Sequence, residues 1–77
     1  MTWILQTILF PIDEWTLTSS KNYLVDNGYK HNKIDIPPGS HYIRYRQKKP
    51  PSSKSYYKTL TRFKNNKKIQ LVYFFKQ

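Results

Sequence analysis

The apolar residues of this chain change their spacing near Lys30, and this change limits the fold more than any other feature. Ahead of it, Leu17, Tyr23 and Leu24 recur at helical spacing. Beyond it, apolar and polar residues alternate, which is the pattern of strands with one buried face. The sequence therefore predicts an α+β fold, in which one helix packs on one face of a mostly antiparallel sheet.

The helix is predicted between Thr16 and Gly28. Thr16 is a favourable N-cap, because a threonine hydroxyl can accept a hydrogen bond from a free N–H group of the first turn. Gly28 follows Asn27 and can adopt the left-handed conformation that commonly ends a helix, and Tyr29 is expected to fold back on the helix end. The residues expected on the face toward the sheet are Leu17, Ser20, Tyr23 and Leu24.

Four segments have the composition and alternation of strands. They are Trp3–Phe10, His41–Gln47, Tyr56–Phe63 and Ile69–Phe75. Ile34–Ile36 is expected to be only an extended piece. The order is then β-α-β-β-β, with the last three strands forming an antiparallel meander and a tight turn at Asn65-Asn66. The last segment is the most apolar, and we expect it to be central or covered.

The chain is short enough to form a single domain, residues 1–77, whose core must be thin. It contains no cysteine, so neither a disulfide nor a thiolate metal site can stabilise it. Two Trp, four Phe and seven Tyr are therefore expected to supply the packing. Residues 48–55 (KKPPSSKS) are predicted to form an exposed basic loop rich in Pro and Ser.

The basic residues are concentrated in the second part of the chain. Fourteen Lys and Arg against four acids give a formal net charge of +10. Residues 1–29 contain one base and three acids, whereas residues 30–77 contain thirteen bases and one acid. A domain charged in this way attracts polyanions to one side. Nucleic acid is the first candidate, followed by an anionic membrane surface or an acidic protein.

The predicted strand faces give a candidate nucleic-acid-binding surface. The side chains expected to face the helix are Ile43, Tyr45, Tyr57 and Phe63. The open face would then carry Tyr42, Arg44, Arg46, Lys58 and Arg62, and the loops beside it Lys48, Lys49, Lys54, Lys64, Lys67 and Lys68. Arg and Lys bind phosphates, and Tyr stacks on bases or donates a hydrogen bond. We therefore predict sequence-independent binding and compaction of nucleic acid, with DNA favoured over RNA and double-stranded DNA as the main ligand.

Catalysis and cofactor binding are not expected. The carboxylates fall in different segments, at Asp13, Glu14, Asp26 and Asp35. No pair of them has metal-ligand spacing, and both histidines are expected to be exposed. Two glycines cannot supply a glycine-rich phosphate loop, so no small-molecule substrate is predicted. The apolar run at residues 3–12 is too short to span a bilayer and follows no basic residue, so we expect neither membrane insertion nor secretion.

Two alternatives use the same basic surface. Exposed Arg and Lys can simply keep a small sheet soluble, with no ligand at all. A structural virion protein such as a capsid cement, or an adaptor, would instead use the basic face to bind an acidic protein. A homodimer also stays open, because an exposed and hydrophobic first or last strand would pair between copies.

Several short motifs occur between residues 5 and 74. They are Trp15-Thr16, Tyr23-Leu24, Gly28-Tyr29, Tyr42–Gln47, Tyr57–Thr59 and Ile69–Val72. Together they resemble a pattern of small basic proteins and domains of large DNA viruses of eukaryotes, the marseilleviruses and their relatives, and of some phages. The chain differs from that pattern at Ser19-Ser20, where a small alanine is usual, and at Pro37–Gly39, which lengthens a connection. The resemblance implies a viral protein that condenses the genome, located in the virion and in the host cytoplasm or nucleus. It implies no catalytic residue.

Overall fold

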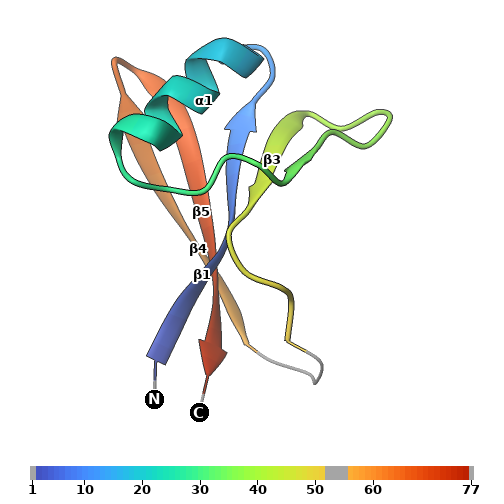
Figure 1. The fold of residues 1–77 in the computed structure, drawn as a ribbon, viewed down its shortest axis with the longest axis vertical. Coiled ribbons are helices and arrows are strands. Elements are labelled where there is room, and N and C mark those ends of the chain that lie inside the picture. The colour runs from blue at the N-terminus through green and yellow to red at the C-terminus, as the bar shows by residue number, and fades with distance from the viewer. Residues whose placement is uncertain (1, 52–55, 77) are drawn as a thin grey trace.

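Strand β1 (Thr2–Pro11) lies inside a five-stranded antiparallel sheet, and helix α1 (Leu17–Asp26) covers one face of that sheet (Figure 1). This computed structural model describes residues 2–51 and 56–76. The other elements are β2 (Ile34–Asp35), β3 (Tyr42–Arg46), β4 (Tyr57–Lys64) and β5 (Lys67–Lys76). The predicted α+β fold is confirmed, with β2 as an additional short strand. Within the described residues, no helix has the length and apolar character needed to cross a membrane.

The ends of α1 are capped as predicted. The Thr16 hydroxyl accepts a hydrogen bond from the Ser19 N–H at 3.0 Å, and the Thr16 N–H donates to the Ser19 hydroxyl at 2.9 Å. This reciprocal pair is a capping box. At the other end, Gly28 has a φ of +75°, and the Tyr29 N–H donates to the Leu24 carbonyl at 2.9 Å. Tyr29 packs against the core, so the predicted apolar contact after the cap is also confirmed.

The core lies between α1 and the strands beneath it. Its buried side chains are Ile8, Phe10, Trp15, Leu24, Ile43, Tyr45, Ile69 and Leu71. The Phe10 ring lies edge-on to the rings of Trp15 and Tyr45, at centroid distances of 5.0 and 5.5 Å. Edge-to-face pairs of this kind add stability beyond the area that they bury. Aromatic residues therefore supply much of the packing, as their number in the sequence predicts.

Leu17 is the one residue of the predicted helix face that does not pack on the sheet. Ser20 and Leu24 are buried and Tyr23 is half-buried, whereas Leu17 is exposed. A helical Cα–Cβ bond tilts toward the N-terminus of the helix. The side chain of Leu17, the first helical residue, therefore projects past the end of α1 instead of onto the sheet.

The order of the strands differs from the predicted meander. It is β2-β3-β1-β5-β4, so β1 lies between β3 and β5, and β3 does not pair with β4. Strands β3 and β4 are therefore three strand spacings apart, which is about 14 Å. Strand β5 is interior, as expected. Both β1 and β5 have neighbours on either side, so the predicted pairing of copies through an exposed first or last strand is wrong for these strands.

Strand β4 presents the opposite faces from those predicted. Leu60 lies opposite Leu71, and Arg62 lies opposite Ile69. Directly opposite residues of an antiparallel pair project to the same face. Since Ile69 and Leu71 belong to the core beneath α1, the side chains of Lys58, Leu60 and Arg62 project to the helix side.

Tyr57 and Phe63, expected to face the helix, consequently project to the open face, where 51% and 69% of their surface is exposed. The cause is the two-residue turn between β4 and β5. Asn65 and Asn66 have φ values of 52° and 66°, the positive values of a tight hairpin turn. This turn sets Lys64 opposite Lys67 and so fixes every pair that follows. The alternation within β4 could not show which of its faces is toward the helix, because both faces carry apolar residues.

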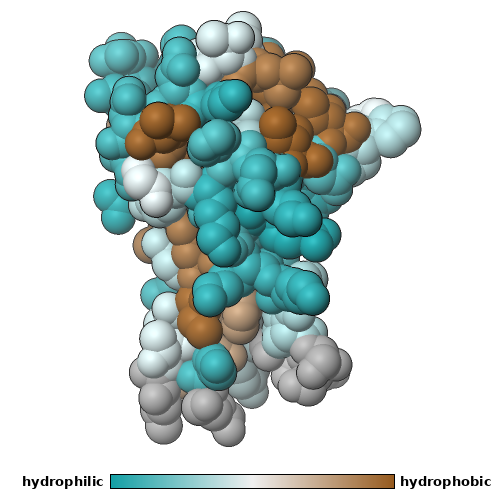
Figure 2. All heavy atoms as spheres, in the orientation of Figure 1, coloured by the Kyte–Doolittle hydropathy of each residue, from teal (hydrophilic) through white to brown (hydrophobic). Residues whose placement is uncertain are grey.

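The sheet has two parts that differ in how they are covered. The part under α1 contains the core, whereas the first residues of β1, the last of β5 and the first of β4 extend away from the helix (Figure 1). Figure 2 shows hydrophilic residues over much of the surface below α1 and a hydrophobic strip along the extending strands. The two kinds of surface lie side by side.

Candidate functional site

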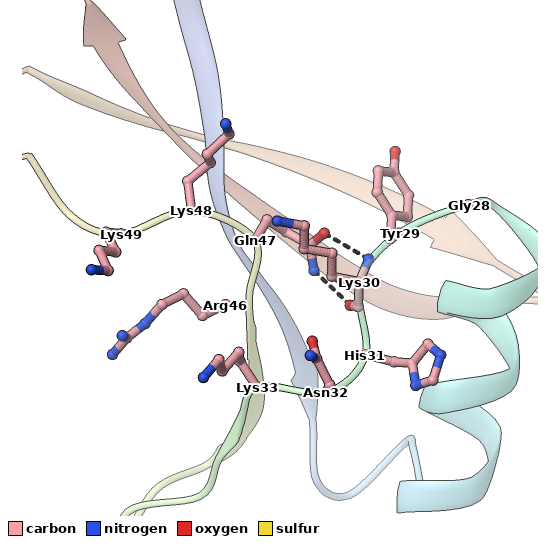
Figure 3. A pocket seen from close by; sticks show the side chains of 10 residues that line it. All are labelled: Gly28, Tyr29, Lys30, His31, Asn32, Lys33, Arg46, Gln47, Lys48 and Lys49. Atoms are coloured by element: carbon pink, nitrogen blue, oxygen red, sulfur yellow. Dashed lines mark hydrogen bonds between the residues drawn. The ribbon is translucent and has the colours of Figure 1, made fainter.

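A hollow of about 740 Å³ opens beside the end of β3, where the chain that follows α1 passes it (Figure 3). The bases that line it are Lys30, Lys33, Arg46, Lys48 and Lys49, and we refer to these five as the basic corner. No aspartate or glutamate is among the described residues that line the hollow. All five basic residues are exposed. Their charges therefore face solvent together, at the point where two distant parts of the chain meet.

Backbone hydrogen bonds and one buried amide hold the basic corner in place. The Gln47 side chain accepts a hydrogen bond from the Lys30 N–H at 2.9 Å and donates one to the Lys30 carbonyl at 2.8 Å (Figure 3). The Arg46 N–H donates to the Lys33 carbonyl at 2.9 Å, next to the β2–β3 pairing. The Gln47 N–H donates to the Gln6 carbonyl at 2.7 Å, which ties this edge to β1. The long basic side chains thus start from a fixed backbone.

The side chains of the basic corner diverge in direction. Figure 3 shows Lys33, Arg46 and Lys49 projecting to one side of the hollow, while His31 points toward α1. A guanidinium can form two parallel hydrogen bonds to one phosphate, and an ammonium adds a point charge with rotatable donors. The three bases on the common side can therefore bind an anion together, and the same geometry suits a repeating polyanion.

Arg44 and Tyr42 lie on the open face of β3, as predicted, but their surroundings differ from those of the basic corner. Arg44 lies opposite Asp35 on β2 and opposite Leu9 on β1. The carboxylate of Asp35 on the same face offsets part of the charge of Arg44. Tyr42 is half-buried opposite Pro11, which leaves less of its ring free for stacking.

Of the remaining predicted bases, those that the structure describes lie on the β4–β5 hairpin, away from β3. We refer to Lys58, Arg62, Lys64 and Lys67 as the hairpin bases. The prediction that Lys58 and Arg62 share the open face with Arg44 and Arg46 is wrong, because the register of β4 directs them to the helix side. In addition, β1 and β5 separate β3 from β4. The predicted single surface is thus two basic clusters.

Two hairpin bases already contact aromatic rings. Lys58 Nζ lies 4.4 Å from the ring centroid of Trp3, and Lys67 Nζ lies 5.3 Å from that of Trp15. Cation–π contacts of this kind hold the ammonium over the ring face. The nearby Lys68 contributes through its backbone, since its N–H donates to Glu14 Oε2 at 3.3 Å and its carbonyl accepts from Trp15 Nε1 at 2.9 Å. Structural contacts therefore account for part of this cluster.

Lys54 lies outside the described residues, as do residues 52–55 of the predicted basic loop. Lys48 and Lys49, at the start of that loop, are described and belong to the basic corner. Lys30 and Lys33 were not expected in the site. The apolar–polar alternation of Ile34 and Asp35 could have indicated a short strand that pairs with β3. Such pairing places Lys33 next to Arg46.

The described residues offer little for other chemistry. No group of three or more His, Cys, Asp or Glu side chains among them could hold a metal ion. Among the residues that the structure describes, Tyr23 has a shifted pKa. Burial raises the pKa of Tyr23 above its ordinary value of 10.0, the neighbouring Tyr29 adds to the rise, and Arg62 opposes it. Tyr23 packs against the core, so we attribute this shift to packing.

Comparison with known proteins adds no relative. Neither the protein-family models, nor the curated proteins, nor the solved structures contain a match to this chain.

Proposed function

We propose that the protein binds nucleic acid through the phosphate backbone, with the basic corner as the contact surface. The observation that carries this proposal is the gathering of five exposed bases around one hollow on a fixed backbone, without a carboxylate among the described lining residues. Each base is free to displace a counterion from a phosphate, which is the main source of sequence-independent affinity.

The charge distribution supports a polyanionic ligand. Three of the four acids, Asp13, Glu14 and Asp26, precede residue 30. The fourth, Asp35, lies opposite Arg44 and not among the residues lining the hollow. A field of this form steers a polyanion toward the basic corner before contact. Phosphate contacts position a protein without reading sequence, so the proposal includes little sequence preference.

Phosphates are common to duplex and single-stranded nucleic acid, and the basic corner suits both. Compaction of a viral genome, expected from the resemblance to proteins of large DNA viruses, is one setting for such binding and stays a prediction. The same holds for location in a virion and for a cementing or adaptor role on an acidic protein.

A pair of matched charge-reversal variants tests the proposal. Lys33→Glu/Arg46→Glu changes two bases of the basic corner, whose side chains are exposed. Lys21→Glu/Lys64→Glu changes the net charge equally, with one exposed site on α1 and one at the tip of the β4–β5 hairpin. Fluorescence anisotropy with a labelled duplex of random sequence measures the affinity of both variants and of the original protein.

We expect the first variant to lose at least about tenfold in affinity, which corresponds to about 1.4 kcal/mol, and the second to lose much less. Circular dichroism should show that both variants are folded. Equal losses in the two variants would mean that net charge alone governs binding, and the basic corner would then not be the site.

A further inference from the structure

The part of the sheet that extends beyond α1 carries an unusual set of side chains. A β-bulge at Gln6 shifts the register of β1 against β5 between Leu5 and Thr7. Leu5 lies opposite Tyr73, and Thr7 lies opposite Val72. Because neighbouring residues of β5 face opposite ways, the bulge keeps Leu5 on the helix side while Thr7 turns to the open face. Leu5 and Trp3 therefore stay on the helix side, where Leu5 packs against the core. The start of β1 extends past it and forms a surface that α1 does not cover (Figure 1).

Aromatic rings dominate this uncovered surface. Trp3 lies opposite Phe75, and their rings pack edge-to-face at a centroid distance of 5.1 Å. The Phe75 N–H donates to the Tyr56 carbonyl at 3.0 Å, which extends the β4–β5 pairing by one residue and brings Tyr56 into the same row. We refer to Trp3, Tyr56, Tyr73 and Phe75 as the aromatic end. Trp3 and Tyr56 are 38% and 77% exposed, so their rings can be reached from solvent.

The charge around the aromatic end is positive. Lys58 Nζ lies 4.4 Å from the ring centroid of Trp3 and 5.7 Å from that of Tyr73. The sequences of β1, β4 and β5 contain no Asp or Glu. A surface with aromatic rings and lysine but no carboxylate is complementary to an anionic ligand that has flat, stackable groups. The like charge of two copies would oppose their contact through this surface.

The aromatic end lies on the helix side of the sheet, whereas Arg46 of the basic corner projects to the open face opposite Thr7, and the two surfaces meet at the β-bulge. The Lys48 N–H donates to the Gln6 carbonyl at 3.2 Å, so the basic corner reaches β1 at its bulge. Trp3 lies three residues further along the same strand, which corresponds to about 10 Å. A chain whose phosphates bind Lys48 and Lys49 could therefore bring its next bases to Trp3 and Tyr56.

We infer that the aromatic end stacks unpaired bases, so that the preferred ligand is single-stranded nucleic acid. This inference rests on the proposed function, since the basic corner binds the phosphates of the same strand. Duplex bases are already stacked on each other and have no free faces for Trp3 and Tyr56. Stacking on aromatic side chains tolerates any base, which agrees with binding that is independent of sequence.

Two variants and a control test the inference. Trp3→Leu and Tyr56→Leu keep an apolar side chain but remove the ring. Phe63→Leu is the control, because Phe63 is also an exposed aromatic residue but lies on the open face of β4, outside the aromatic end. Anisotropy titrations use labelled oligothymidylate of about 15 nucleotides, within the usual span of one small domain, and a duplex of equal length.

We expect the original protein to bind oligothymidylate more tightly than the duplex. Trp3→Leu and Tyr56→Leu should each weaken binding of the single strand about tenfold and leave the duplex affinity unchanged. Phe63→Leu should bind both ligands as the original protein does. Oligothymidylate should also quench tryptophan emission. That quenching should disappear in Trp3→Phe, because the remaining Trp15 is buried.

The outcomes separate the inference from the proposed function. Equal affinity for both ligands, with no effect of Trp3→Leu or Tyr56→Leu, would overturn the inference and leave binding at the basic corner intact. Absence of binding to either ligand near physiological salt would overturn both. Tyr56→Leu changes a largely exposed side chain and is expected to fold, so a failure of Trp3→Leu to fold would not prevent the test.

Discussion

The hydroxyl oxygens of Ser20 and Tyr45 lie 2.8 Å apart in the buried contact between α1 and β3. Both residues are fully buried. Ser20 Oγ also lies 2.8 Å from the Thr16 carbonyl, to which it can donate its single proton. Tyr45 then donates to Ser20. Ser20 therefore provides a hydrogen-bond partner for the Tyr45 hydroxyl in the core.

Removing this hydrogen bond should cost a modest part of the stability. Tyr45→Phe is expected to lower the free energy of unfolding by about 1 kcal/mol, whereas Tyr45→Ala, which also leaves a cavity, should lower it by about 3–5 kcal/mol. Urea unfolding followed by circular dichroism measures both values. In a double-mutant cycle with Ser20→Ala, the two single changes should not add, because each removes the same bond. Strict additivity would show that the hydroxyl pair contributes nothing.

The register of β4 makes a second prediction. Phe63 projects to the open face and is mostly exposed, so Phe63→Ser should change the free energy of unfolding by no more than about 0.5 kcal/mol. Leu71→Ala, in the core opposite Leu60, should cost about 2–5 kcal/mol. If Phe63→Ser were as costly as Leu71→Ala, Phe63 would face the helix and the register would be shifted by one residue.

The raised pKa of Tyr23 leads to a prediction of how the stability of the protein changes at alkaline pH. Its pKa is raised in the folded protein, first by burial and then by Tyr29, so the folded state holds the phenol proton more tightly than the unfolded state. The resulting contribution to stability is fully present below the unfolded pKa of about 10 and is lost as the pH rises through the folded value. Urea midpoints measured on either side of pH 10 should fall less in Tyr23→Phe than in the original protein. Equal falls would contradict this assignment.

The local elements of the fold could be predicted from the sequence, because short-range signals define them. The N-cap at Thr16 and the left-handed exit at Gly28 determine the ends of α1. In β3, the two faces differ clearly, so Ile43 and Tyr45 are buried as predicted. The order of the strands in the sheet was not predicted, because it depends on pairing between segments that are far apart in the sequence. Nothing within β3 or β4 indicates that β1 lies between them.

The candidate site was predicted only in part for the same reason. Arg46, Lys48 and Lys49 follow from the basic strand and its loop, whereas Lys30 reaches them only through the buried amide of Gln47. The side of the sheet to which each face of β4 projects could have been predicted from the sequence. A two-residue turn at Asn65-Asn66 places Arg62 opposite Ile69, and applying that rule would have directed Arg62 to the helix side.

The salt dependence of binding tests the central claim most directly. Anisotropy titrations of a random duplex are carried out with the original protein at several salt concentrations, and the logarithm of the binding constant is plotted against that of the salt concentration. If the five bases of the basic corner each neutralise a phosphate, the slope should be roughly −4 to −5. Lys33→Glu/Arg46→Glu should make it shallower by about 2. Weak binding with a flat slope that the variant does not change would contradict phosphate binding at the basic corner and leave an acidic protein as its partner.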